Sequence, residues 1–180
     1  VDGTQGWKAT DTSNLNDIAL QPTYITATGG TITESGNFKI HTFTGPGTFC
    51  VSVTGNPAGG PTNVDYMVVG GAGGAGGGEG TGGGGAGGFR ESSGATSGCY
   101  TASPLGAGVS GLPVSVTGYP ITVGGGGSGG PCASVRGNSG GNSTFSTITS
   151  AGGGGGGGGG GNLPPVGDGN GGGSGGGGGG

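Results

Sequence analysis

Runs of β-branched and aromatic residues alternate with polar positions in the first part of the chain, and this pattern predicts short strands. Segments containing glycine and proline separate the runs, as is typical of antiparallel strands joined by tight turns. We expect strands over residues 24–27, 37–43, 48–53 and 64–69. Gly45-Pro46-Gly47 has the length of a hairpin connection, so the runs that flank it are expected to pair with each other.

A second pattern begins after residue 69, where strand-like runs continue directly into glycine. It occurs three times: 64–69 continues into 70–88, 119–123 continues into 124–127, and 144–149 continues through Ser150-Ala151 into 152–161. An extended strand and a three-residue-per-turn extended helix have neighbouring φ and ψ values, so a strand can pass into such a helix without reversing direction. Each of these strands is therefore expected to continue into a glycine helix, and the glycine helices are expected to run parallel to one another.

Together the two patterns predict an all-β fold with almost no α-helix. A small antiparallel β-sandwich-like unit is expected at 22–69, and its strands are expected to run into a bundle of packed polyglycine II helices at 70–180. Residues 89–113 contain less glycine and predict a loop that emerges from this bundle. Residues 1–21 show only a weak helical spacing and are expected to be a linker or the end of a preceding module. We expect the bundle to continue beyond residue 180.

The composition strengthens the prediction of a backbone-dominated structure. Of 180 residues, 60 are glycine, and only 27% are hydrophobic. Collagen is excluded, because its triple helix needs glycine at every third position and this chain has unbroken glycine runs. Ordering 60 glycines costs about 60–120 kcal/mol of backbone entropy. Since glycine has no side chain, a regular lattice of backbone hydrogen bonds must offset that cost.

The charge pattern argues against two classes of partner. The formal net charge is −4, and the basic side chains are Lys8, Lys39, Arg90 and Arg136. Nucleic acids and anionic membrane surfaces are bound by clustered basic residues, which this chain lacks. The longest apolar run is far shorter than the about 18 residues of a membrane-spanning helix. We therefore expect neither nucleic-acid binding nor membrane insertion.

No pattern of residues predicts an enzyme, a metal site or a cofactor. Gly137-Asn138-Ser139-Gly140-Gly141 fits the Gly-x-Ser-x-Gly nucleophile motif formally, but no helix is predicted after it, so a turn is favoured. His41 is the single histidine and lies within a predicted strand, which favours a packing role. The Asp and Glu residues are scattered, and the cysteines do not have metal-ligand spacing.

Three cysteines leave the disulfide pattern open. Cys50 alternates with Phe49 and Val51 and is expected to be a small buried residue. Cys99 and Cys132 both fall in predicted loops between glycine segments, where a disulfide would tie the loops together. The odd number of cysteines leaves this pairing undetermined.

Side chains able to recognise a partner are concentrated in two segments, the 89–113 loop and its neighbour around 132–142. Loops on a rigid scaffold commonly carry binding residues. The candidates are Arg90, Glu91, Tyr100, Arg136 and Asn138. The Tyr100 ring suits either stacking on a sugar or protein partner or capping an end of the bundle, whereas Tyr66 and Tyr119 are expected to pack inside strands. The alternative is that the loop contacts a neighbouring subunit.

Several blocks carry a family resemblance. They are TITESGNFKIHTFTGPGTF at 31–49, VDYMVVGG at 64–71, GGFR at 87–90, YPITVG at 119–124 and FSTI at 145–148. They resemble the glycine-rich module of tailed-bacteriophage virion surface proteins, especially tail-fibre-like proteins of marine phages. A looser similarity is to phage adhesins that present variable loops from packed polyglycine helices, but no binding residue of theirs can be matched here.

The resemblance implies a structural protein on the virion surface, a tail fibre or adhesin for host attachment. The expected partners are other virion proteins and a glycan or protein of the host cell surface. A homo-oligomer is expected, with a trimer favoured. Two alternatives stay open: a capsid decoration or head-fibre protein, and a secreted ice-binding or structural glycine-rich protein.

Overall fold

The computed structural model describes residues 21–94, 109–131, 135–160 and 167–179. These residues contain antiparallel strands and no helix, which confirms the predicted all-β class. The weak helical spacing before residue 20 lies outside the described residues. The strands are β1 (Ile25–Thr28), β2 (Thr31–Ser35), β3 (Phe38–Thr42), β4 (Gly47–Thr54), β5 (Asn63–Val64), β6 (Met67–Val69), β7 (Phe89–Glu91), β8 (Leu112–Pro113), β9 (Gly118–Thr122), β10 (Ser143–Phe145) and β11 (Ile148–Ser150).

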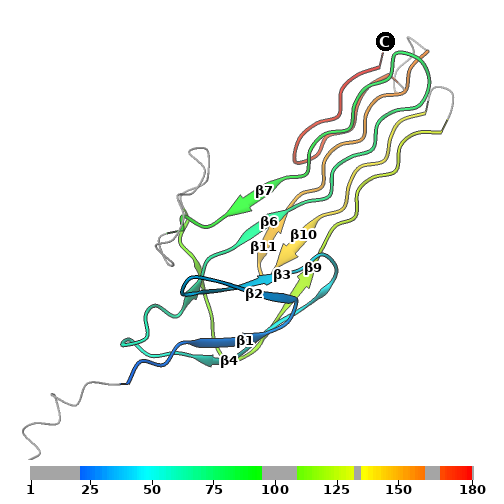
Figure 1. Ribbon diagram of the computed structural model, residues 1–180. Coiled ribbons are helices and arrows are strands. Elements are labelled where there is room, and N and C mark those ends of the chain that lie inside the picture. The colour runs from blue at the N-terminus through cyan, green and yellow to red at the C-terminus, as the bar shows by residue number, and fades with distance from the viewer. Residues whose placement is uncertain (1–20, 95–108, 132–134, 161–166, 180) are drawn as a thin grey trace, which may run out of the picture.

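The main sheet has the order β1-β4-β9-β10-β11, and all its neighbours are antiparallel (Figure 1). Strands β9, β10 and β11 come from the part of the chain assigned to the glycine-rich region, so the sheet crosses the boundary expected after residue 69. In β4, Phe49 and Val51 face the core, whereas Cys50 between them is exposed with a free thiol. The prediction that Cys50 is buried is therefore wrong, because alternation places it on the outer face.

Two predicted connections differ from the structure. The Gly-Pro-Gly segment does not close a hairpin, because β3 pairs with β2 while β4 pairs with β1 and β9. The β2–β3 hairpin instead turns over Gly36-Asn37, where Gly36 has φ +57°, a conformation that favours glycine. The run expected to be one strand at 144–149 is also a hairpin, β10–β11, which reverses at Ser146 with φ +55°.

An aromatic cluster forms the core on which the strands converge. The buried residues are Ala27, Phe49, Val51, Val68, Val114 and Phe145. The Phe145 ring lies at the centre, with ring centroids 5.9 Å from Phe49, 6.2 Å from Tyr119 and 6.4 Å from Tyr66. The predicted packing roles of Tyr66 and Tyr119 are confirmed.

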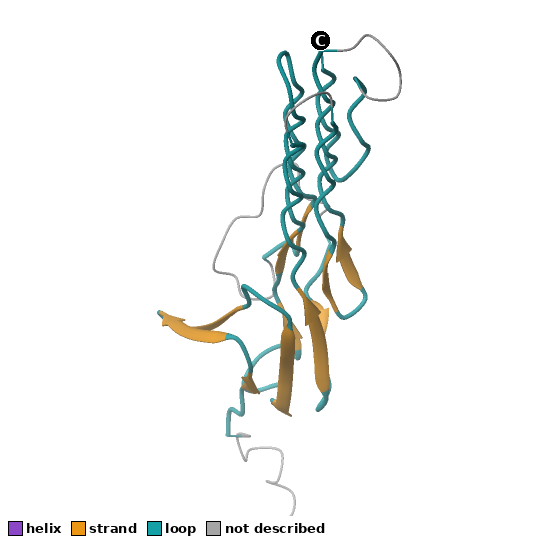
Figure 2. Cartoon of the chain, turned by 90° about the vertical axis from the view of Figure 1, so that its right-hand side faces the viewer, coloured by secondary structure: helices purple, strands orange, loops and turns teal. Residues whose placement is uncertain are grey.

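Beyond the sheets, six glycine-rich segments lie side by side and project away as an elongated bundle (Figures 1 and 2). They are neither helix nor strand, and we number them in chain order. The segments are I (70–77), II (82–88), III (124–130), IV (135–141), V (152–159) and VI (167–179). Segment VI doubles back on itself, since the amides of Gly176 and Gly179 donate to the carbonyls of Asn170 and Gly167. Segment IV contains the Gly-x-Ser-x-Gly motif, which is extended here and does not form the expected turn.

Lateral backbone hydrogen bonds join the segments at every third residue. In segment I, the amides of Gly70, Gly73 and Gly76 donate to segment II, and those of Gly71, Gly74 and Gly77 donate to segment IV, at 2.8–3.0 Å. Segment V donates to segment I in the same rhythm, from Gly153, Gly156 and Gly159. A period of three is the period of an extended three-fold helix, and it supports the polyglycine II interpretation, which stays a prediction.

Segment V forms the centre of the bundle. All eight of its residues are buried, and its backbone bonds to segments I, II, IV and VI. Segments I and V enter the bundle from β6 and β11, two strands that lie beside the aromatic cluster. The core of the sheets thus fixes where the central glycine segments begin.

Candidate recognition surface

Arg90 and Glu91 lie in β7 and not in the expected 89–113 loop. This strand pairs with β6, with Arg90 opposite Val68 and Glu91 opposite Met67. The other end of the expected loop is also a strand, since β8 pairs with β5. Residues 95–108 between these strands lie outside the described residues, and so do the candidate Tyr100 and the candidate disulfide partners Cys99 and Cys132.

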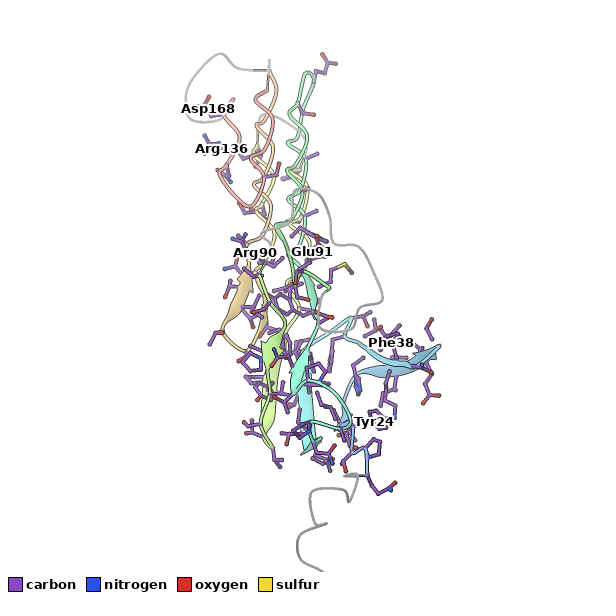
Figure 3. All side chains as sticks on the ribbon, turned by 90° about the vertical axis from the view of Figure 1, so that its left-hand side faces the viewer. Tyr24, Phe38, Arg90, Glu91, Arg136 and Asp168 are labelled. Atoms are coloured by element: carbon purple, nitrogen blue, oxygen red, sulfur yellow. The ribbon has the colours of Figure 1, made fainter. Side chains whose placement is uncertain are left out.

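The Arg90 side chain is exposed where the strands enter the glycine segments (Figure 3). Within the described part of the chain it makes no hydrogen bond or ion pair. On the same strand pair, Met67, Val69 and Phe89 are 68%, 50% and 47% exposed. Directly opposite and alternate residues of a strand pair share a face, so these three apolar side chains form one patch. Arg90 lies opposite Val68, so its side chain is on the other face of the strand pair from this patch. An exposed arginine and an exposed apolar patch are each suited to binding a partner.

Arg136 and Asn138 lie on segment IV and have internal partners. The Asn138 side-chain Nδ2 donates to the Ser128 hydroxyl at 2.7 Å, and Arg136 Nη1 donates to the Asn170 side-chain oxygen at 3.2 Å. These bonds tie segment IV to segments III and VI. Arg136 lies farther along the bundle than Arg90, so the structure does not bring the four described candidates, Arg90, Glu91, Arg136 and Asn138, into one site (Figure 3).

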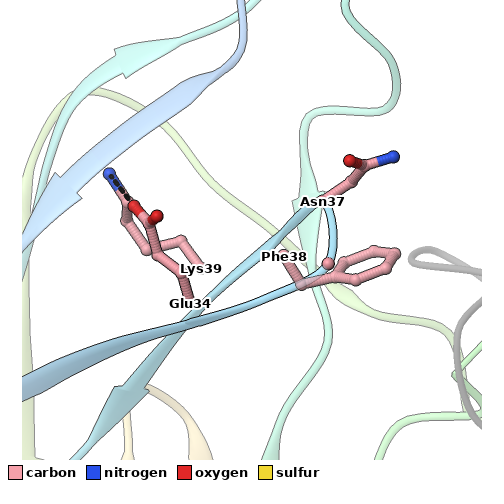
Figure 4. Close-up of a pocket in the computed structure, with 5 residues that line it drawn as sticks. Glu34, Asn37, Phe38 and Lys39 are labelled. Carbon is pink, nitrogen blue, oxygen red and sulfur yellow. Dashed lines mark ion pairs between the residues drawn. The ribbon is translucent and has the colours of Figure 1, made fainter.

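The β2–β3 hairpin is a surface feature that the sequence pattern did not predict. The hairpin projects from the side of the sheets with Phe38 near its tip, and every residue of β2 is exposed (Figure 3). A shallow hollow at the tip is lined by Glu34, Gly36, Asn37, Phe38 and Lys39 (Figure 4). Lys39 Nζ and Glu34 Oε1 are 3.9 Å apart across the hairpin. The turn-forming Ser35-Gly36-Asn37 was the available signal.

Buried polar groups near β7 form hydrogen bonds that stabilise the fold. The Ser92 hydroxyl donates to a carboxylate oxygen of Asp65 at 2.7 Å and accepts from the Tyr66 amide at 3.1 Å. Ser92 is 1% exposed, so this network holds the end of β7 against the segment before β6. The strand that carries Arg90 is therefore held in place by these hydrogen bonds.

In the described ranges, no group of three or more His, Cys, Asp or Glu residues is placed to hold a metal ion. The same ranges contain no helix that is both long and apolar enough to cross a membrane.

The chain matches no protein-family model, no curated protein and no solved structure.

The single histidine gives a first prediction about stability. His41 Nδ1 lies 2.8 Å from the Gly29 carbonyl oxygen, and its ring meets the Phe49 ring edge-on with centroids 5.0 Å apart. We expect His41→Ala to lower the free energy of unfolding by about 1–2 kcal/mol, through one lost hydrogen bond and one lost ring contact. Urea unfolding measures this. Lys39→Ala, on the same face of β3 but half exposed, is the control. Equal stability of the two variants would contradict the packing role.

Proposed function

We propose that this chain is a structural protein of the virion surface, a tail fibre or adhesin that uses a glycine bundle as a rigid scaffold for host attachment. The observation that carries the proposal is the bundle itself. Its central segment is eight buried glycines held by hydrogen bonds on several sides, which suits a stiff projection and leaves no room there for a reacting group. The resemblance of the β blocks to tailed-phage modules supports the same role.

The scaffold restricts where recognition can take place. Inner rows of the bundle present backbone alone, so specificity requires side chains at the base and on the outer rows. At the base, Arg90 is exposed on one face of the β6–β7 pair and the patch of Met67, Val69 and Phe89 on the other. Arginine and aromatic rings are residue types that commonly anchor a binding hot spot. A glycan or protein of the host surface is the proposed ligand, and other virion proteins are the proposed assembly partners.

Immunogold electron microscopy of the phage particles that carry this chain tests the location. With an antibody raised against the chain, we expect gold at the tail. Gold over the capsid would instead support a decoration or head-fibre protein. Particles that carry no gold would overturn the virion assignment and leave the secreted structural protein as the alternative.

Recognition by the base of the bundle gives a second prediction. Arg90→Ala should weaken adsorption to host cells about 30-fold, the equivalent of about 2 kcal/mol for a hot-spot arginine. Stability should not change, because Arg90 has no partner within the described residues. Arg136→Ala should instead lower stability, because it removes the bond to Asn170.

Adsorption and thermal unfolding of particles with each variant, beside Lys39→Ala as a matched loss of positive charge, measure this difference. Normal adsorption by the Arg90 variant would remove the base from the recognition surface. Failure of that variant to enter particles would assign it to a subunit contact.

A further inference from the structure

Arg136 is a cation in the bundle whose partner carries no charge. Its side chain is partly buried, and among the described residues its Nε is buried without a hydrogen-bond partner and no carboxylate forms an ion pair with it. Its Nη1 donates instead to the neutral side-chain oxygen of Asn170, at 3.2 Å. A charge that is partly removed from water is costly unless an opposite charge lies beside it. The Asn170 amide thus occupies the place where a carboxylate would serve this arginine better.

This asparagine belongs to a chemically reactive pair. Asn170 is followed by Gly171, and the sequence contains no other Asn-Gly pair. The backbone amide of the residue that follows an asparagine can attack the side-chain carbonyl carbon, which makes asparagine one of the thermolabile residues. Glycine favours this attack, because it has no side chain to hinder it and the least restricted backbone. The residue that bonds to Arg136 is therefore able to turn itself into a carboxylate.

The structure leaves the attacking nitrogen free and polarises the carbonyl that it attacks. The Asn170 amide donates to the Gly155 carbonyl at 2.8 Å, and its backbone carbonyl accepts from the Gly176 amide at 3.0 Å. The Gly171 amide, in contrast, makes no hydrogen bond within the described part of the chain, and Gly171 is exposed, with nothing within 4 Å of an added Cβ. The Arg136 guanidinium on the side-chain oxygen of Asn170 stabilises the negative charge that develops there during the attack.

We propose that Asn170 is a self-modification site, at which deamidation produces a carboxylate that pairs with Arg136. The Gly171 nitrogen loses its proton and bonds to Cγ of Asn170, the bond from Cγ to Nδ2 breaks, and ammonia leaves. Water then opens the cyclic imide. Cleavage of the new bond gives aspartate, and cleavage of the original peptide bond gives isoaspartate. The net change exchanges one amide for one carboxylic acid by hydrolysis, with no oxidation or reduction.

The aspartate product supplies the missing counter-charge and leaves the main chain unchanged. Hydrogen bonds from a guanidinium to a carboxylate are about twice as strong as neutral ones, so the modification should hold segment VI more firmly on segment IV. The isoaspartate product instead adds a methylene to the main chain and displaces the carbonyl that accepts from Gly176. The proposal does not depend on the virion role, because it uses only contacts inside the bundle.

Peptide mapping by mass spectrometry of the folded 180-residue chain, incubated in neutral buffer, tests the reaction. A synthetic peptide of residues 167–174 sets the time, and the incubation ends when this peptide is fully deamidated. We expect Asn170 to be the main site of deamidation, with aspartate among its products. Asn138, which precedes Ser139 and bonds to Ser128, is the matched control and should keep its amide. An unconverted Asn170, isoaspartate alone, or equal conversion of Asn138 would overturn the proposal.

The substitution Asn170→Asp tests the pairing without the reaction. We expect it to raise the melting temperature by about 2–4 °C, the shift of one stronger bond in a chain of this size. The gain should vanish when Arg136→Gln is combined with it, because the new carboxylate then has no cation beside it. Asn138→Asp adds the same charge to the bundle away from Arg136 and should give no gain. Absence of any gain, a gain that persists without Arg136, or equal gains from both aspartates would refute the pairing.

Discussion

Gly156→Val should be among the most destabilising single substitutions in this chain. Gly156 lies in the buried central segment, where an added Cβ atom would collide with the carbonyl oxygen of Gly82 in segment II. The Gly156 amide donates to the Gly74 carbonyl at 2.9 Å, and the Gly156 carbonyl accepts from the Gly137 amide at 2.9 Å. A side chain would therefore separate segments on several sides of segment V at once.

The expected loss is about 3 kcal/mol or more of the free energy of unfolding. Overpacking costs about 1–3 kcal/mol, and each displaced hydrogen bond adds about 0.5–1.5 kcal/mol. For a chain of this size, that loss corresponds to a fall of about 6–12 °C in melting temperature. Amide hydrogen exchange should show that protection is lost first along the central segment.

Gly83→Val is the matched control for this experiment. Gly83 lies in the neighbouring segment II, is exposed, and would have nothing within 4 Å of an added Cβ. We expect its melting temperature to stay close to that of the unmodified chain. If the two valine variants melt together, close packing of the central glycines is not what holds the bundle.

Strand positions were predictable from the sequence, whereas the pairing of strands was only partly so. The alternation around Phe49 indicated β4, but β2 has the polar sequence Thr-Ile-Thr-Glu-Ser and was not predicted. Pairing partners depend on contacts distant in sequence, such as β4 with β9, which no local pattern specifies. The prediction that Cys50 is buried was wrong for a local reason. Cys50 alternates with the core residues Phe49 and Val51, and this alternation already placed it on the opposite face of the strand.

The candidate site was less predictable than the fold. Loop residues were chosen because glycine cannot supply specificity, but Arg90 and Glu91 proved to lie in a strand that continues from segment II. The sequence showed the glycine run ending at residue 88, but Phe89-Arg90-Glu91 is too short to show the alternation of a strand. Arg136 and Asn138 were selected for the same reason, and their side chains instead bond to Asn170 and Ser128, residues remote in sequence.

Phe145→Ala should be the most damaging substitution in the sheets. The Phe145 ring is 8% exposed and contacts the rings of Phe49, Tyr66 and Tyr119. Truncation of a buried phenylalanine costs about 3–5 kcal/mol through lost apolar contact and the cavity left behind. Urea unfolding should show this loss, whereas Phe89→Ala, which removes a half-exposed ring, should cost less than about 1 kcal/mol.

The location of Phe145 adds a second expectation, because it packs where the glycine segments begin. Tyr66 directly precedes β6, which leads into segment I, and Phe145 itself is joined through β11 to segment V. Loss of the ring should therefore raise hydrogen exchange at the base of both segments before the β1–β4 pair opens. If exchange rises equally in all strands, the cluster stabilises the sheets as a whole and does not act as the anchor of the bundle.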